Sequence, residues 1–234
     1  MYCIDGKYYY VMQLAGNCAG MGYLGDDRIR GPVDNVVTKG KKCLEALFNN
    51  TYFDGVKNGP CTVARRDRQF EGDSDYLFDY PFVKILHNNI TDPKYLESLQ
   101  KRIECFNDFY NKVKTRPEKD HFFTINLNEY DLTYFSKEFK LKGTNFIKML
   151  DYLQEQGICE QCILVLTKID REPRIDWVDF TNEYIEDDIV DKLIKKYHIN
   201  CFKIINDDVW TTKESSEQFT NQFIELIKSR KDNN

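Results

Sequence analysis

The second half of the chain alternates short apolar runs with amphipathic segments, and this alternation most limits the folds open to it. Three apolar runs, at residues 121–127, 162–166 and 201–205, have the length of strands. Because they are apolar along their whole length, both faces of each strand must be covered, as in a parallel sheet flanked by helices. The pattern therefore favours an α/β fold.

The segments between these runs have the periodicity of helices. Helices are expected at residues 92–114, 145–156, 185–197 and 215–228. In the first, apolar residues such as Leu99, Ile103 and Phe106 recur at steps of three and four and give one buried stripe. Gly157 is expected to end the second helix. Each helix can therefore cover one strip of the sheet.

Together these elements predict a three-layer α/β fold whose mostly parallel sheet is flanked by helices. The apolar run at residues 8–14 is expected to join the same sheet. Residues 49–90 are interrupted by Gly and Pro and are expected to form an irregular insertion. No linker or internal repeat divides the sequence, so we interpret residues 1–234 as a single domain.

Composition limits the partners and the compartment. A net charge of −5 and a pI near 5.4 argue against nucleic acid or an anionic membrane as a partner. No apolar run approaches the roughly 18–20 residues of a membrane span, and Asp5 and Lys7 make the start unlike a signal peptide. The eight cysteines, several of them inside predicted strands and helices, indicate reduced thiols and a cytoplasmic protein.

The first candidate for chemistry is Cys18, in the glycine-rich run at residues 13–22 that follows the first apolar strand. Glycines allow a sharp turn there, and the first turn of a following helix directs free N–H groups at the same place. A thiolate in that position is stabilised by the helix dipole and becomes nucleophilic. The alternative is a small buried cysteine that packs beneath a helix.

A reactive thiol needs a base, and the chain has three histidines. His121 begins a predicted strand and His198 ends a predicted helix, so structural roles explain both. His87 follows the strand-like run at residues 82–86 and therefore lies at the end of an element, as Cys18 does. Two such ends can converge in space, which makes His87 the preferred base.

A third group usually orients the imidazole of such a base. Asp34, in the sequence Gly-Pro-Val-Asp-Asn, is the leading candidate, and Asn35, Asp79 and Asn88 are alternatives. Asp34 has an equally good structural explanation as the N-cap of the helix that follows it.

Three short motifs bear on this site: Gly16-Asn17-Cys18, Gly31-Pro32-Val33-Asp34 and Ile85-Leu86-His87-Asn88-Asn89. Together they resemble a family of uncharacterised bacterial and viral proteins catalogued as papain-like cysteine peptidases, over roughly residues 8–170. The resemblance implies Cys18 as nucleophile, His87 as base and Asp34 as an acidic partner or structural residue. The chain differs from the family pattern at Val33 and Asn35, which replace aromatic residues, and at Asn88, which replaces Asp.

Other motifs carry less weight. Residues 167–170 (Thr-Lys-Ile-Asp) mimic the guanine-specificity motif of small GTPases, but the sequence has no Gly-x-x-x-x-Gly-Lys-Ser/Thr phosphate loop. Cys159 and Cys162 have the spacing of a zinc half-site or redox pair, but no second pair accompanies them, which favours packing. Asp207 and Asp208 follow the last predicted strand, at the sheet edge expected for Cys18.

We therefore expect a cysteine-dependent hydrolase or acyltransferase that acts on a peptide or small acyl substrate and uses no cofactor or metal. One alternative is a non-enzymatic interaction protein in which residues 49–90 form the binding surface. Another is a metal-dependent sugar or nucleotide transferase that uses Asp207 and Asp208.

Overall fold

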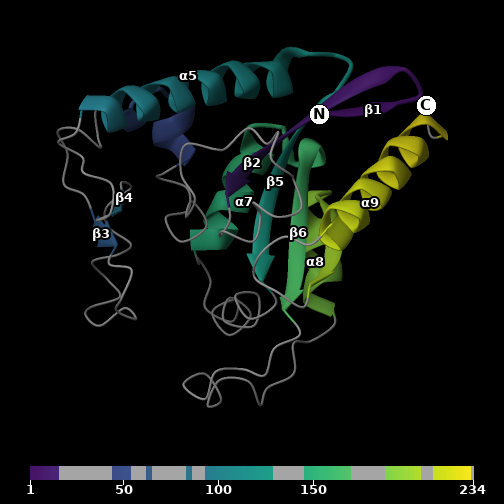
Figure 1. Ribbon diagram of the computed structural model, residues 1–234. Coiled ribbons are helices and arrows are strands. Elements are labelled where there is room, and N and C mark those ends of the chain that lie inside the picture. Colours follow the sequence, from purple (N-terminus) through teal and green to yellow (C-terminus); the bar gives the residue numbers. More distant parts are fainter. Residues whose placement is uncertain are drawn as a thin grey trace.

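The computed structural model describes eight stretches of the chain (Figure 1). They are residues 1–15, 44–53, 62–64, 83–85, 93–128, 145–169, 188–206 and 213–232. The strands are β1 (Tyr2–Ile4), β2 (Lys7–Ala15), β3 (Thr62–Ala64), β4 (Val83–Ile85), β5 (His121–Asn128), β6 (Cys162–Ile169) and β7 (Asn200–Asn206). The helices are α5 (Pro93–Thr115), α7 (Asn145–Glu155), α8 (Asp188–Tyr197) and α9 (Lys213–Asp232), together with the 3-10 helix η1 (Cys159–Gln161) and a short helical segment at residues 44–48. None of these helices combines the length and the apolar composition that a membrane span requires.

The main sheet has five strands in the order β1-β2-β5-β6-β7. Strands β2, β5, β6 and β7 run parallel to one another, and β1 pairs with β2 in the antiparallel sense. The prediction of a mostly parallel α/β sheet is confirmed, and so is the inclusion of the first long apolar run as β2. The predicted helix ends agree with the observed ones to within about one turn. Gly157 follows α7 with a φ of 71°, as expected of a helix-ending glycine.

The order of the parallel strands decides which helices share a face of the sheet. From β2 to β7 each strand of the main sheet is added beside the previous one. For strands added in this order, the right-handed crossovers typical of parallel sheets place connecting helices on one face. Side chains of α5, α7 and α8 accordingly share a core with Met12, Phe123 and Leu164. Helix α9 follows the last strand and packs Phe219 and Phe223 on the other side of these strands (Figure 1).

The hairpin of β1 and β2 was not predicted from the sequence. Its two-residue turn is Asp5-Gly6, and both residues have positive φ values, 50° and 77°, as a type I′ turn requires. The Asp-Gly dipeptide is a strong hairpin signal and could have revealed the turn. The hairpin places the ring of Tyr2 5.0 Å from that of Phe223, so β1 extends the core beneath α9.

Two short strands lie within the predicted insertion at residues 49–90. β3 and β4 pair in parallel and form a separate two-stranded sheet. β4 falls inside the run at residues 82–86 that we interpreted as strand-like. Apart from residues 49–53 and these two strands, the insertion lies outside the described residues.

A glutamine side chain from α9 covers the outer edge of the sheet at β7. The main-chain N–H of Lys203 donates to Gln222 Oε1 at 3.0 Å, and Gln222 Nε2 donates to the carbonyl of Lys203 at 2.8 Å. The amide therefore takes the place of a neighbouring strand at Lys203. Exposed strand edges promote pairing between molecules, and occupying the donor and acceptor of an edge residue hinders it.

Replacing Gln222 by Ala is expected to free this edge. The Gln222→Ala variant should lose about 0.5–1.5 kcal/mol of unfolding free energy and should aggregate faster, as measured by light scattering during incubation at elevated temperature. Asn221→Ala is the matched control, because Asn221 is an exposed amide on the same helix. Equal aggregation rates for the two variants would show that Gln222 does not protect the edge.

Candidate functional site

The residues predicted to carry the chemistry, Cys18, Asp34 and His87, lie outside the described residues. The same holds for the alternatives Asn35, Asp79 and Asn88 and for Asp207 and Asp208. The structure does describe the strands that precede two of the motifs. Strand β2 ends at Ala15, three positions before Cys18, and β4 ends at Ile85, two positions before His87.

The last part of β2 is irregular and contains a buried polar side chain. Its pairing with β5 shifts register between Gln13 and Ala15, as at a β-bulge, and bulges often occur next to functional sites. Gln13 is paired with Thr124 of β5, and both side chains are buried. The hydroxyl of Thr124 has no hydrogen-bond partner within the described part of the chain. Gln13 and Thr124 each interrupt an apolar stretch of their strand, a signal that can be seen in the sequence.

The valine variant of Thr124 tests whether this hydroxyl is unpartnered. If it is, Thr124→Val removes a buried polar group without removing a bond, and the variant should be neutral or more stable by up to about 1 kcal/mol in urea unfolding. Thr220→Val is the matched control, since the Thr220 hydroxyl donates to the carbonyl of Ser216 at 2.7 Å and its loss should destabilise. A Thr124→Val variant destabilised as much as the control would mean that this hydroxyl has a partner.

The described thiols inside the core are unsuited to nucleophilic chemistry. Cys159 and Cys162 are buried, and their Sγ atoms donate to the carbonyls of Leu150 at 3.8 Å and Ile158 at 3.4 Å. Burial raises the pKa of Cys159 to about 11 and that of Cys162 well above its usual value. Burial also raises the pKa of Cys201 to about 11. These thiols are protonated at neutral pH, and the cysteine pair acts here as part of the core.

No described group of three or more His, Cys, Asp and Glu side chains is arranged to hold a metal ion. Cys3 and Cys105 are exposed, reduced thiols on β1 and α5.

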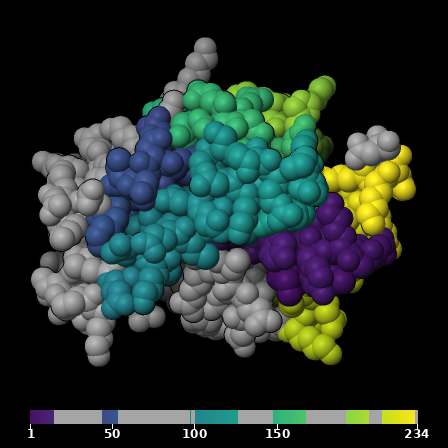
Figure 2. Space-filling view, turned by 90° about the horizontal axis from the view of Figure 1, so that it is seen from above, coloured from purple at the N-terminus to yellow at the C-terminus, as the bar shows by residue number. Residues whose placement is uncertain are grey.

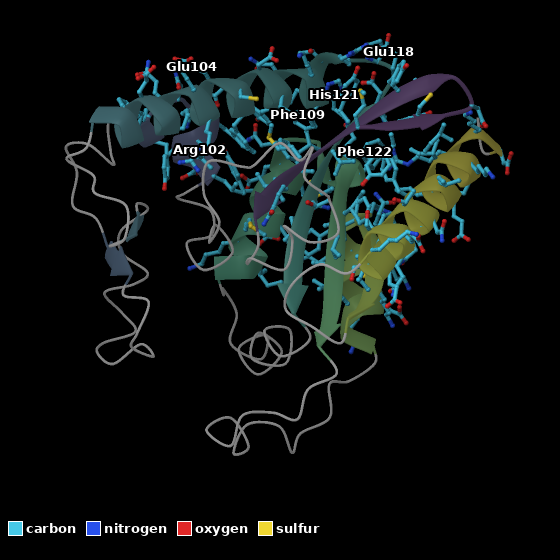
Figure 3. The ribbon with its side chains drawn as sticks, viewed as in Figure 1. Arg102, Glu104, Phe109, Glu118, His121 and Phe122 are labelled. Atoms are coloured by element: carbon cyan, nitrogen blue, oxygen red, sulfur yellow. The ribbon has the colours of Figure 1, made fainter. Side chains whose placement is uncertain are left out.

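His121 is part of a chain of polar side chains at the beginning of β5, in which Asp120 and His121 are buried and Arg116 is half-exposed. Its Nδ1 lies 2.6 Å from Asp120 Oδ1, and Asp120 Oδ2 lies 3.3 Å from Arg116 Nη2. The imidazole stacks on Tyr10, with ring centroids 4.7 Å apart, and meets the ring of Phe109 edge-on at 4.9 Å (Figure 3).

This arrangement favours a structural role for His121. A carboxylate that holds an imidazole is also the orienting half of a catalytic His–Asp pair. Here, however, only 3% of His121 is exposed, and aromatic rings from β2 and α5 contact it. The pair therefore fastens the beginning of β5 to α5. Its position at the amino end of β5 is opposite to the carboxyl end of β2, which the Cys18 motif follows.

Comparison with known proteins finds no matching family model, no similar curated protein and no similar solved structure. Arguments about function therefore rest on the residues of this chain.

Proposed function

We propose that the protein is a cysteine-dependent hydrolase or acyltransferase, with Cys18 as nucleophile, His87 as base and Asp34 as the group that orients the imidazole. The observation that carries this proposal is the position of β2. It is a parallel strand of the main sheet, and it ends at Ala15, immediately before the Gly-Asn-Cys run. Open α/β sheets bind their ligands at the carboxyl ends of the strands, so this run follows the edge where a site is expected.

We also propose that the helices and the main sheet form a three-layer arrangement. Helices α5, α7 and α8 form one layer, the five-stranded sheet forms the second, and α9 forms the third. In this arrangement both faces of β5 and β6 are covered, and the carboxyl edge of the sheet is where loops such as the one after β2 can build a site.

In the proposed reaction, His87 takes the proton from the Cys18 thiol, and the thiolate attacks the carbonyl carbon of a peptide or small acyl substrate. Backbone N–H groups of Ala19 and Gly20 hold the oxyanion of the tetrahedral intermediate. The intermediate collapses as the bond to the leaving group breaks, and His87 returns the proton to that group. Water or another acceptor then attacks the thioester and releases Cys18, which gives hydrolysis or acyl transfer.

Selective alkylation tests the activated thiol. At pH 7 iodoacetamide should modify Cys18 faster than the other seven cysteines, because the thiolate is the reactive form. Thiols with a pKa of about 11, such as Cys159 and Cys201, are ionised at pH 7 to about one part in 10⁴. Their labelling should increase with pH up to about 11, whereas that of Cys18 should already be near its plateau. Peptide mass spectrometry at timed intervals gives each rate.

Histidine variants test the base in the same assay. His87→Ala should slow the labelling of Cys18 by about tenfold or more, and His198→Ala, a change at an exposed position after α8, is the matched control. The activated-thiol proposal fails if Cys18 labels no faster than the exposed Cys105.

A further inference from the structure

A groove of about 570 Å³ opens at the edge of the sheet where the parallel strands begin. Its walls come from the beginning of β2, the loop before β5, the turn before β6, the beginning of β7 and the last turn of α9. The permanently charged residues that line it are Lys7, Glu118, Lys119, Glu160, Arg230 and Lys231. Figure 2 views the molecule from this end, where the N-terminal hairpin (purple) lies between the segment around α5 (teal) and α9 (yellow).

Cations outnumber carboxylates in this groove, although the whole chain has a net charge of −5. Lys119 lies 2.8 Å from Glu160, and Lys231 pairs at 2.9 Å with Asp5. Lys7 donates to the backbone carbonyl of Glu118 at 3.4 Å, and within the described part of the chain it forms no ion pair with a carboxylate. The groove is therefore a local centre of positive charge on an acidic protein.

Arg230 adds a cation that is already partly removed from water. Its guanidinium lies over the ring of Phe122, with Cζ 4.9 Å from the centroid, and Nη2 donates to the carbonyl of Glu160. Burial lowers the pKa of this guanidinium. Phe122 is the second residue of β5, near the amino end of that strand (Figure 3). A partly desolvated cation interacts more strongly with an anion than an exposed one does.

The ion pairs that Lys119 and Lys231 form with carboxylates can open to admit a ligand with little loss of free energy. Both ion pairs are between exposed side chains, and such pairs contribute about 0–1 kcal/mol. An anion with two or more charges can therefore displace Glu160 from Lys119 and contact several cations at once. The volume of the groove is in the range of small-molecule sites, roughly 300–1,000 Å³.

We propose that this groove binds a small oxyanion of the phosphate or phosphoester class that carries at least two negative charges, held by Lys7, Lys119 and Arg230. This site is at the amino edge of the sheet, whereas the proposed Cys18 site follows the carboxyl edge. A result that contradicts one of these two proposals therefore leaves the other unaffected.

Isothermal titration of the full chain with inorganic pyrophosphate tests the proposal. The wild-type chain should bind one equivalent with a Kd below about 1 mM, weaker at higher ionic strength, and pyrophosphate should raise its Tm. Lys7→Gln combined with Lys119→Gln should weaken binding about tenfold or more. Lys101→Gln combined with Lys148→Gln is the matched control, because it removes the same charge from exposed positions that do not line the groove.

Several results would overturn the proposal: no saturable binding by the wild-type chain at about 5 mM pyrophosphate, equal weakening in both double variants, or citrate binding as tightly as pyrophosphate. Amide chemical-shift changes in the wild-type chain provide a test that needs no variant. They should be concentrated at Lys7, Lys119 and Arg230, and a pattern that spares all three would contradict the site.

Discussion

Strands β5 and β6 carry apolar side chains on both faces, and the rest of the fold follows from the need to cover both. Phe122 and Phe123 are adjacent on β5 and point to opposite faces, as do Ile163 and Leu164 on β6, and all four are fully buried. Burying one such side chain contributes roughly 1.5–3 kcal/mol, so leaving either face open would cost a large part of a typical stability. Side chains of α5, α7 and α8 pack in one cluster with Phe123 and Leu164, and side chains of α9 pack in another with Phe122 and Ile163.

Because strands β2, β5, β6 and β7 are parallel, all four begin at one edge of the sheet and end at the other, and different kinds of residues gather at the two edges. At the amino edge lie the buried Asp120–His121 pair, which the half-exposed Arg116 contacts, and the basic groove. At the carboxyl edge, β2 ends just before the glycine-rich run that contains Cys18. The thiols of Cys159 and Cys162, at and just before the beginning of β6, are kept protonated because burial raises their pKa values. The proposed reactive thiol and the proposed anion site are thus assigned to opposite edges of one sheet.

Local sequence patterns predicted the elements whose periodicity is strong. The apolar stripe of α5 and the uninterrupted run of β6 can each be recognised within a single segment, and so can the glycine after α7. The Asp5-Gly6 hairpin was also locally encoded but was overlooked. The contact of Gln222 with the edge of β7 and the groove between Lys7, Lys119 and Arg230 could not be predicted, because they depend on how α9 and the strands pack against one another.

The proposed active site likewise combines features that a single segment reveals with features that depend on how distant segments pack. Cys18 and His87 were predicted to follow strand-like runs, and the described strands β2 and β4 end three and two positions before them along the sequence. Whether the two side chains meet depends on how those ends converge, which no local pattern determines. The most direct measurement is the distance from Cys18 Sγ to the nearer His87 ring nitrogen in a crystal structure. The account predicts a separation within about 4 Å; a separation beyond about 10 Å in an ordered site would contradict it.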